Sequence, residues 1–238
     1  MKSRKLYGLL LASVLAMGGC EPGSEDTPQR SADRRPPAAE QAEDARDAVV
    51  LFLGDSITAG YGLAREAAYP SLIQQKIDSL GWPIRVVNGG LSGDTSSGGL
   101  RRLDWLMRDR VDVLVVALGG NDGLRGIEPG AMRENLEQII DEARERNEEI
   151  QIVLAGMRMP PNLGASYTQR FERVYHELVE QKAVHFIPFL LEGVGGEARL
   201  NQRDGIHPTA AGQRVIAEHV WHSLHPILET MQQRDAPA

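Results

Sequence analysis

The chain has almost no cysteine and no excess of positive charge. Cys20 is the only cysteine among 238 residues, so an intramolecular disulfide is excluded. Lysine and arginine total 26 against 33 acidic residues, the formal net charge is -7, and no basic run occurs. A nucleic-acid patch needs clustered basic residues, and docking on anionic lipid needs a positive balance. We therefore expect neither a nucleic-acid partner nor electrostatic attachment to a membrane.

Several catalytic motifs are also absent. No Gly-x-Ser-x-Gly sequence occurs, so the nucleophile turn of the α/β-hydrolases is missing, and there is no P-loop sequence. One formal match to a dinucleotide fingerprint, Gly193-x-Gly195-x-x-Ala198, lies late in the chain without the required strand-turn-helix context, and we interpret it as a flexible loop. Aromatic residues make up 5% of the chain, which leaves little material for stacking on sugars.

The N-terminus has the layout of a secretory signal peptide. A short positive start precedes an apolar stretch of twelve residues, Leu6 to Met17, which is too short to span a bilayer as a helix. Met17-Gly18-Gly19-Cys20 then resembles a lipobox, in which the cysteine is lipidated and becomes the new N-terminus. We predict a signal peptide over residues 1–19 and lipidation of Cys20; the alternative is a plain signal peptide with Cys20 incidental. The expected location is the cell envelope, as a membrane-anchored lipoprotein facing the periplasm or as a free periplasmic or secreted protein.

A change in composition marks the start of the folded part. Residues 21–47 contain no Val, Ile, Leu, Met, Phe, Trp or Tyr, so they have nothing to bury in a core. Prolines and charges of both signs favour a solvated spacer. We predict a tether over residues 20–47, a folded domain over residues 48–230 and a C-terminal tail over residues 231–238.

From residue 48 onward, apolar runs alternate with amphipathic stretches. The runs that fit strands buried on both faces are Val49–Leu53, Ile84–Val87, Val111–Leu118, Ile150–Ala155 and Val184–Ile187. The stretches that fit helices are Tyr69–Leu80, Pro129–Arg146, Phe171–Val179 and Ala210–Leu228. This alternation predicts an α/β fold with a mainly parallel sheet covered by helices. Ligands of such sheets bind beyond the carboxyl ends of the strands.

Unusual polar sequences follow three of these strands, and a fourth lies near the end of the chain. They are Gly54-Asp55-Ser56-Ile57-Thr58, Asn88-Gly89-Gly90-Leu91-Ser92-Gly93-Asp94-Thr95, Gly119-Gly120-Asn121-Asp122 and Asp204-Gly205-Ile206-His207-Pro208. A serine such as Ser56 becomes a nucleophile when a base takes its proton, and His207 suits that task near neutral pH. Asp204, one turn of chain away, can hold the imidazole in one tautomer. For an oxyanion, the backbone N–H groups of Ser56 and Gly93 and the side-chain amide of Asn121 are suitable donors.

Each segment also has a purely structural interpretation. Ser56 can cap the following helix, and Gly93 can serve a tight turn. Asn121 can be a turn former after a strand, and Asp204 and His207 can belong to an exposed turn before a helix. The presence of all four segments, in this order and at strand ends, favours the catalytic interpretation.

Together the four segments resemble the ordered sequence blocks of the SGNH/GDSL hydrolase superfamily, most closely its bacterial thioesterase I, lysophospholipase and arylesterase branch. The resemblance spans about residues 48–228. It implies Ser56 as nucleophile with Asp204 and His207 as triad partners, and Gly93 and Asn121 as oxyanion donors beside the Ser56 backbone. It also implies a flavodoxin-like, three-layer αβα sandwich with a five-stranded parallel sheet, and neither a metal nor an organic cofactor.

The resemblance further implies an activity. We expect hydrolysis of carboxylic esters such as aryl esters and lysophospholipids, and of acyl thioesters, through an acyl-enzyme on Ser56, by a chain that is a monomer. Leu124 and Arg125, just after the third block, are candidates for lining the substrate pocket. Two alternatives stay open: a polysaccharide O-acetyl esterase of the same superfamily, and a non-catalytic envelope lipoprotein that binds lipid.

Overall fold

The computed structural model describes residues 48–235. The predicted signal peptide, Cys20 and the predicted tether lie outside the described residues. No helix in the described part has both the length and the apolar character needed to cross a membrane.

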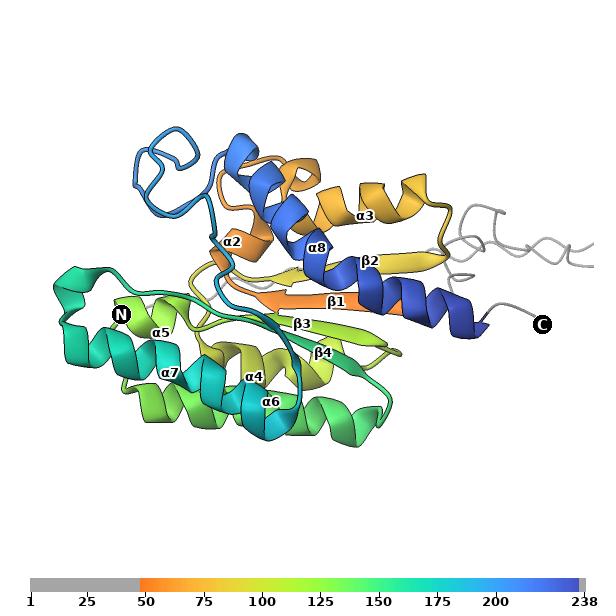
Figure 1. The fold of residues 1–238 in the computed structure, drawn as a ribbon, viewed down its shortest axis with the longest axis horizontal. Coiled ribbons are helices and arrows are strands. Elements are labelled where there is room, and N and C mark those ends of the chain that lie inside the picture. Colours follow the sequence, from red (N-terminus) through yellow and green to blue (C-terminus); the bar gives the residue numbers. More distant parts are fainter. Residues whose placement is uncertain (1–47, 236–238) are drawn as a thin grey trace, which may run out of the picture. The chain divides into compact units, whose positions relative to one another are not determined.

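Five parallel strands form one sheet in the order β2-β1-β3-β4-β5 (Figure 1). The strands are β1 (Ala48–Gly54), β2 (Ile84–Gly90), β3 (Val113–Ala117), β4 (Gln151–Ala155) and β5 (His185–Ile187). Each strand overlaps one of the predicted apolar runs, so the prediction of a five-stranded parallel sheet is confirmed.

Helices cover both faces of the sheet, which gives the predicted three layers. Helices α3 (Tyr69–Ser79) and α8 (Ala210–Asp235) lie on one face. Helices α4 (Ser96–Leu106), α6 (Pro129–Arg146) and α7 (Ala165–Lys182) lie on the other (Figure 1). Two short helices, α2 (Ser56–Ala59) and α5 (Gly120–Leu124), and two 3-10 turns, Arg65–Ala67 and Pro161–Leu163, complete the described elements.

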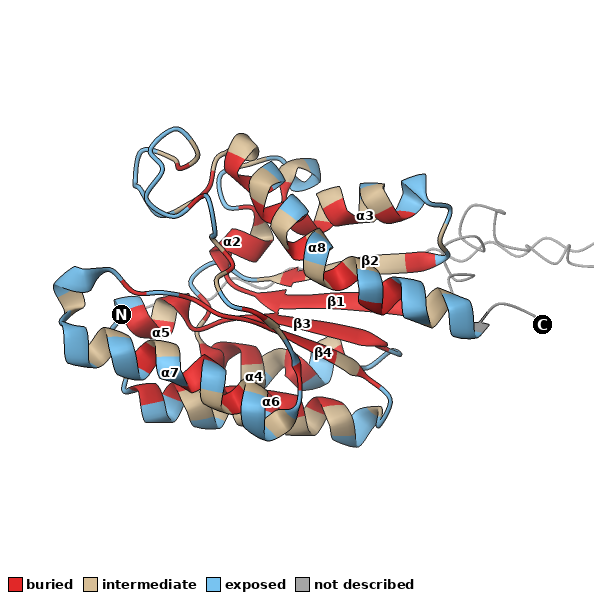
Figure 2. Ribbon diagram, in the orientation of Figure 1, coloured by how far each residue is buried: buried red, intermediate tan, exposed pale blue. Residues whose placement is uncertain are grey.

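The core lies along the three strands that have neighbours on both sides, β1, β3 and β4. Every residue of β1 and of β3 is buried (Figure 2). Such strands have no solvent-facing side, and their sequences are continuous apolar runs rather than alternating ones. The rigid centre of the sheet therefore supports the loops that leave its carboxyl edge.

Several helical assignments differ from the sequence-based ones; the short α5, for example, was not predicted. Helix α4 was not predicted, because Gly98 and Gly99 are poor helix formers and hide its period. A Cβ on Gly99 would lie 2.3 Å from Leu118 Cδ1, so this helix uses small residues to approach the sheet. Helix α7 begins six residues before the predicted Phe171, and α8 continues through residues 231–235 of the predicted tail.

Candidate active site

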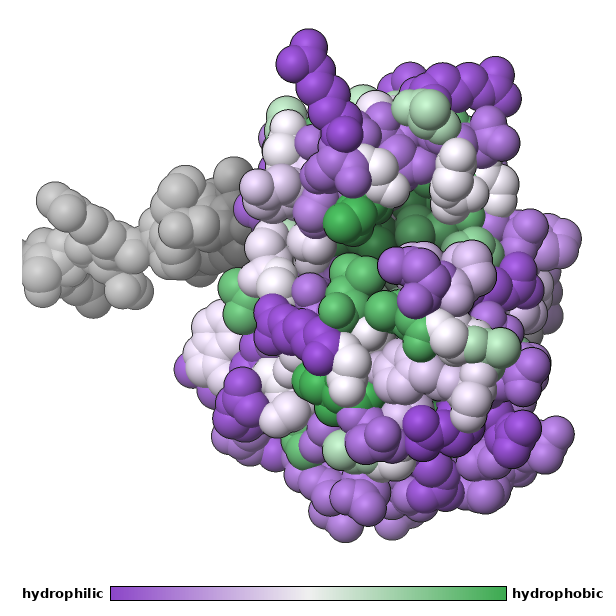
Figure 3. All heavy atoms as spheres, turned by 90° about the vertical axis from the view of Figure 1, so that its left-hand side faces the viewer, coloured by the Kyte–Doolittle hydropathy of each residue, from purple (hydrophilic) through white to green (hydrophobic). Residues whose placement is uncertain are grey.

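The carboxyl ends of β1, β2 and β3 meet at one edge of the sheet. The last residue of β1, Gly54, pairs with Gly90 of β2 and with Ala117 of β3. The loops that carry the first three polar segments therefore leave the sheet next to one another. Figure 3 looks onto this edge and shows apolar side chains gathered near its centre, with hydrophilic ones around them.

Ser56 is the first residue of α2, which follows β1 after a single residue. That single residue, Asp55, caps the helix, because its Oδ1 accepts a hydrogen bond from the Ile57 N–H at 3.0 Å. Ser56 is 9% exposed, so the surrounding structure shields most of this residue from solvent. The capped strand-to-helix turn fixes the position of the Ser56 hydroxyl.

The loop before α8 brings His207 and Asp204 to this serine. His207 Nε2 lies 3.0 Å from Ser56 Oγ, and His207 Nδ1 lies 2.7 Å from Asp204 Oδ2. When Nδ1 carries the proton and donates it to the carboxylate, Nε2 is left to accept the serine proton. The three side chains therefore form one continuous line of hydrogen bonds.

Asp204 accepts hydrogen bonds from backbone and side chain alike. Its Oδ1 accepts from the N–H groups of Ile206 and His207 at 2.9 and 3.0 Å, and its Oδ2 pairs with the His207 ring. These bonds, of which the one from the His207 N–H is the largest cause, lower the pKa of Asp204 to about 2. The carboxyl group is therefore ionised throughout the neutral range and available to the imidazole.

Tyr61 is a further part of the site that the sequence did not single out. Its ring centroid lies 4.4 Å from that of His207, and the residue is 51% exposed. Gln202 connects the two loops, because its Nε2 donates to the Tyr61 carbonyl and its N–H donates to the His207 carbonyl, both at 2.7 Å. Tyr61 lies in a loop without a regular period, so no sequence pattern indicates this contact.

The three groups expected to bind an oxyanion are also near the serine. Within residues 48–235, no group accepts a hydrogen bond from the backbone N–H of Ser56 or of Gly93. Gly93 has a φ of 79°, in the left-handed region that glycine favours. The Asn121 amide donates to the Asp94 carbonyl at 2.9 Å and to Asp55 Oδ2 at 3.3 Å. It thus bridges the residue before Ser56 and the residue after Gly93.

Asp55 is a buried carboxyl group directly beside the nucleophile. It is 5% exposed, and burial raises its pKa to about 6, although the hydrogen bond from Ile57 lowers it in part. Its Oδ2 faces the Asn121 amide. The sequence placed Asp55 inside a functional segment without assigning it a role, and the structure shows that its side chain caps α2 and accepts a hydrogen bond from the Asn121 amide.

The two candidate pocket residues differ in what they contact. Arg125 Nη2 donates to the Gly93 carbonyl at 2.8 Å, so this side chain lies beside a proposed oxyanion donor. Leu124 is 48% exposed and is one of the large apolar side chains that the described part leaves open to solvent. Leu91 and Ile206, which are also exposed, lie on the loops of Gly93 and of His207, and the exposed Tyr61 lies against the His207 ring.

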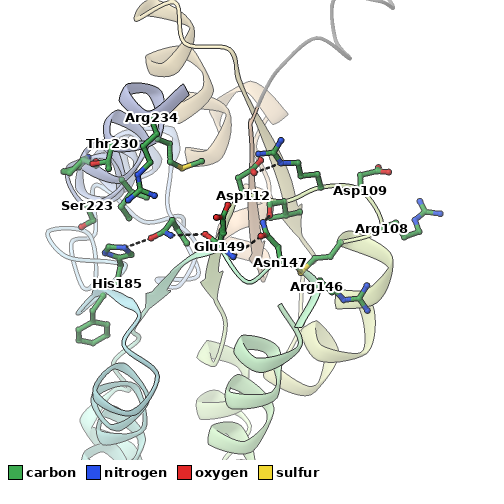
Figure 4. Close-up of a pocket in the computed structure, with 18 of the residues that line it drawn as sticks. Arg108, Asp109, Asp112, Arg146, Asn147, Glu149, His185, Ser223, Thr230 and Arg234 are labelled. Atoms are coloured by element: carbon green, nitrogen blue, oxygen red, sulfur yellow. Dashed lines mark hydrogen bonds and ion pairs between the residues drawn. The ribbon is translucent and has the colours of Figure 1, made fainter. Parts of the chain in front are cut away.

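A large cavity lies elsewhere, at the opposite edge of the sheet. It has a volume of about 980 Å³ and lies among residues before β3, residues at the starts of β4 and β5, and the last turns of α8 (Figure 4). Arg110 Nε donates to Asp112 at 2.7 Å there, and His185 pairs with Gln151 at 3.3 Å. No hydrogen-bonded set of serine, histidine and carboxylate lines this cavity. Nor do the described His, Cys, Asp and Glu side chains form any group that could hold a metal ion.

Comparisons with known proteins agree on one family. Residues 52–215 match the model of the GDSL-like lipase/acylhydrolase family. The chain is 43% identical over 180 residues to the esterase TesA of Pseudomonas aeruginosa, covering 75% of this chain and 89% of that protein. It is 38% identical over 180 residues to an Escherichia coli enzyme named as thioesterase, protease and lysophospholipase, covering 75% and 84%. A crystal structure of the psychrotrophic esterase EstA from Pseudoalteromonas, inhibited by monoethylphosphonate, superposes with a TM-score of 0.73 at 32% identity, covering 77% and 100%.

Proposed function

The chain belongs to the GDSL-like lipase/acylhydrolase family, and we propose that it is a serine esterase that hydrolyses carboxylic esters through an acyl-enzyme on Ser56. The observation that carries this proposal is the line of hydrogen bonds from Ser56 Oγ to His207 Nε2 at 3.0 Å and from His207 Nδ1 to Asp204 at 2.7 Å. Because an unassisted serine hydroxyl is a weak nucleophile, a base within hydrogen-bond reach is the first requirement of this chemistry.

The proposed reaction has two halves. Ser56 Oγ attacks the acyl carbonyl while His207 Nε2 takes its proton, and the ionised Asp204 stabilises the imidazolium that forms. His207 then gives the proton to the leaving alcohol or thiol as the bond to the acyl carbon breaks. Water, deprotonated by His207, attacks the acyl-enzyme, and the acid is released with Ser56 restored.

The tetrahedral intermediates carry negative charge on the former carbonyl oxygen. We assign its stabilisation to the N–H groups of Ser56 and Gly93 and to the Asn121 amide. Two of these donors are unused in the described structure, and the third is held by the Asp94 carbonyl and Asp55. Donors fixed in advance at the place where charge develops are worth about 100- to 1,000-fold in kcat each.

The surroundings of the serine favour a substrate with an apolar acyl or aryl part. Tyr61, Leu91, Leu124 and Ile206 are all about half exposed, and each lies within five residues of a proposed catalytic or oxyanion group along the chain. Isolated half-exposed apolar residues need no explanation, but four in the segments that carry the proposed catalytic groups favour apolar contact with the substrate. Relatives named as esterase, arylesterase and as thioesterase and lysophospholipase support the same substrate classes: aryl esters, lysophospholipids and acyl thioesters.

The test uses a short p-nitrophenyl ester and a fluorophosphonate probe. We expect Ser56→Ala to fold normally, to lower kcat/KM by about 10,000-fold or more, and to abolish labelling by the probe. Phosphonate chemistry is appropriate, since the related EstA is inhibited by monoethylphosphonate. If Ser56→Ala kept its turnover, the assignment would be wrong; if the wild type were never labelled, a lipid-binding role without catalysis would replace it.

We also propose that the protein is anchored in the cell envelope through a lipid on Cys20. The support is the lipobox-like sequence before this cysteine and the spacer composition after it. Palmitate labelling of cells that express the wild type and Cys20→Ser tests the anchor. Label in the wild type that is lost in the variant is the expected result, and an unlabelled wild type would exclude lipidation.

A further inference from the structure

Arg102 on α4 connects three segments at the carboxyl edge of the sheet. Its Nε donates to Asp94 Oδ2 at 2.7 Å, its Nη1 to the Gly89 carbonyl at 2.5 Å, and its Nη2 to the Gly54 carbonyl at 2.9 Å. The Arg102 side chain is 18% exposed, and that of Asp94 is 8% exposed. A planar guanidinium with all three nitrogens bonded in this way is held in one orientation and fixes its acceptors in turn.

The acceptors adjoin the proposed oxyanion donors. Gly54 stands two residues before Ser56, and Asp94 stands one residue after Gly93. The Gly54 carbonyl also accepts the Leu91 N–H at 3.0 Å, so the second loop is folded back on the first. A displacement of the guanidinium would therefore shift the peptides that present the N–H groups of Ser56 and Gly93.

Asp94 extends this connection to the third donor. Its carboxylate pairs with Arg102, while its backbone carbonyl accepts the Asn121 amide at 2.9 Å. A Cβ on Gly98 would lie 1.7 Å from Asp94 Oδ1, so only glycine at this place on α4 leaves room for the carboxylate. Helix α4 therefore supplies Arg102 and also, at Gly98, leaves the space that the Asp94 carboxylate occupies.

We infer that Arg102 is a positioning residue for oxyanion stabilisation: paired with Asp94, it fixes the geometry of the Ser56 N–H, the Gly93 N–H and the Asn121 amide. This inference rests on the proposed function, and nothing in it requires Arg102 to touch the substrate. Supporting residues behind a catalytic group typically change rates by about 10- to 100-fold when they are removed.

The first experiment compares Arg102→Lys and Arg102→Met with Arg101→Met. Arg101 is the adjacent exposed arginine and bonds only to Ser97 Oγ in the described structure. For both Arg102 variants we expect kcat to fall by about 10- to 100-fold while KM stays within about threefold, because the donors act on the transition state rather than on the bound ester. Inhibition by an alkyl trifluoromethyl ketone, which forms a tetrahedral oxyanion with an active serine, should weaken in parallel with kcat. Arg101→Met should leave all three quantities unchanged.

A double-mutant cycle separates positioning from general loss of structure. In an Asn121→Ala background the amide is absent, so Arg102→Met should cost clearly less than it costs in the wild type. An effect of equal size in both backgrounds, or an unchanged kcat, would overturn the inference. If Arg102→Met does not fold, Arg102→Lys and Asp94→Asn, which keep side chains of similar size, provide the same comparison.

Ser56→Ala is measured in the same series, so that two kinds of failure can be told apart. Turnover that survives Ser56→Ala would refute the proposed function itself. Turnover that depends on Ser56 but not on Arg102 would refute only the positioning role.

Discussion

The two ends of the sheet differ in what their loops bring together. At the carboxyl end a hydroxyl, an imidazole and a carboxylate form one line, and the backbone N–H groups of Ser56 and Gly93 are unused by the described residues. At the amino end there is a cavity of about 980 Å³, in whose lining Arg110 pairs with Asp112 and His185 pairs with Gln151 (Figure 4). The convergence of reactive groups, and not the size of a cavity, therefore indicates the proposed catalytic site.

The topology explains this difference. Each strand of a parallel sheet passes into a helix at its carboxyl end, so helix N-termini with unsatisfied N–H groups face that edge. Helices α2, α4 and α5 all begin there. Helix C-termini lie at the amino end of the sheet, and their last carbonyls face outward. Arginines donate hydrogen bonds to such carbonyls, as Arg144 does to the Lys182 carbonyl. Only the first arrangement stabilises developing negative charge.

The strongest test of the comparison exchanges one histidine at each end for glutamine. His207→Gln should lower kcat/KM by at least about 1,000-fold, because no base then remains to take the Ser56 proton. His185→Gln, in the amino-end cavity, should leave kcat/KM unchanged, since its ring pairs only with Gln151 there. Steady-state hydrolysis of a p-nitrophenyl ester measures both.

Circular dichroism and thermal unfolding of the two variants are the control, because both should remain folded. A large loss of activity in His185→Gln with intact folding would break the comparison. It would mean that the amino-end cavity takes part in catalysis.

The sequence predicted the sheet well for a physical reason. Strands buried on both faces leave continuous apolar runs, and these are visible without knowledge of their neighbours. The four polar segments were visible because their residue types suit one reaction and each stands at a strand end or before a helix. The prediction that these segments lie close together rested largely on a family resemblance. In the structure, His207 Nε2 lies 3.0 Å from Ser56 Oγ.

Other parts of the structure could not be predicted, because they depend on contacts across the fold. Helix α4 was missed because Gly98 and Gly99 erase its pattern. Arg101 and Arg102 are adjacent and have the same side chain, so the sequence does not distinguish them. Only the packing of α4 decides which of the two faces the strand ends. The contact of Tyr61 with His207 joins two irregular loops, and no local signal marks it.

A second prediction sharpens the comparison through Asp55, a buried carboxyl group at the carboxyl end of the sheet. Its pKa is raised from 3.8 to about 6 by burial, so the folded state holds a proton that the unfolded state releases. Below about pH 4 both states are protonated, and above about pH 6 the folded state contains a buried charge. Stability contributed by this group is thus present at low pH and lost as pH rises through that window, by about 3 kcal/mol at most.

Asp55→Asn removes this titration. Urea unfolding at about pH 4.5 and pH 7.5 should show that the wild type loses stability relative to Asp55→Asn as the pH rises. Activity of the variant should fall as well, because the asparagine amide would face the Asn121 amide with a donor instead of an acceptor. A stability difference between the two proteins that does not change with pH would show that folding does not raise the pKa of Asp55.

The smallest expected effect concerns Asp112, the buried carboxylate of the amino end. Its Oδ2 accepts the Val49 N–H at 2.8 Å at the start of β1, and its Oδ1 pairs with the exposed Arg110. Asp112→Ala leaves a buried N–H without an acceptor and should lower the free energy of unfolding by about 1–3 kcal/mol, with kcat/KM unchanged. Arg110→Ala removes only the exposed partner and should cost less than about 1 kcal/mol. Urea unfolding and ester hydrolysis of the two variants measure this contrast. If Asp112→Ala lowered kcat/KM while still folded, a change at the amino end would affect activity at the carboxyl end. The separation of the two ends into a structural one and a catalytic one would then be wrong.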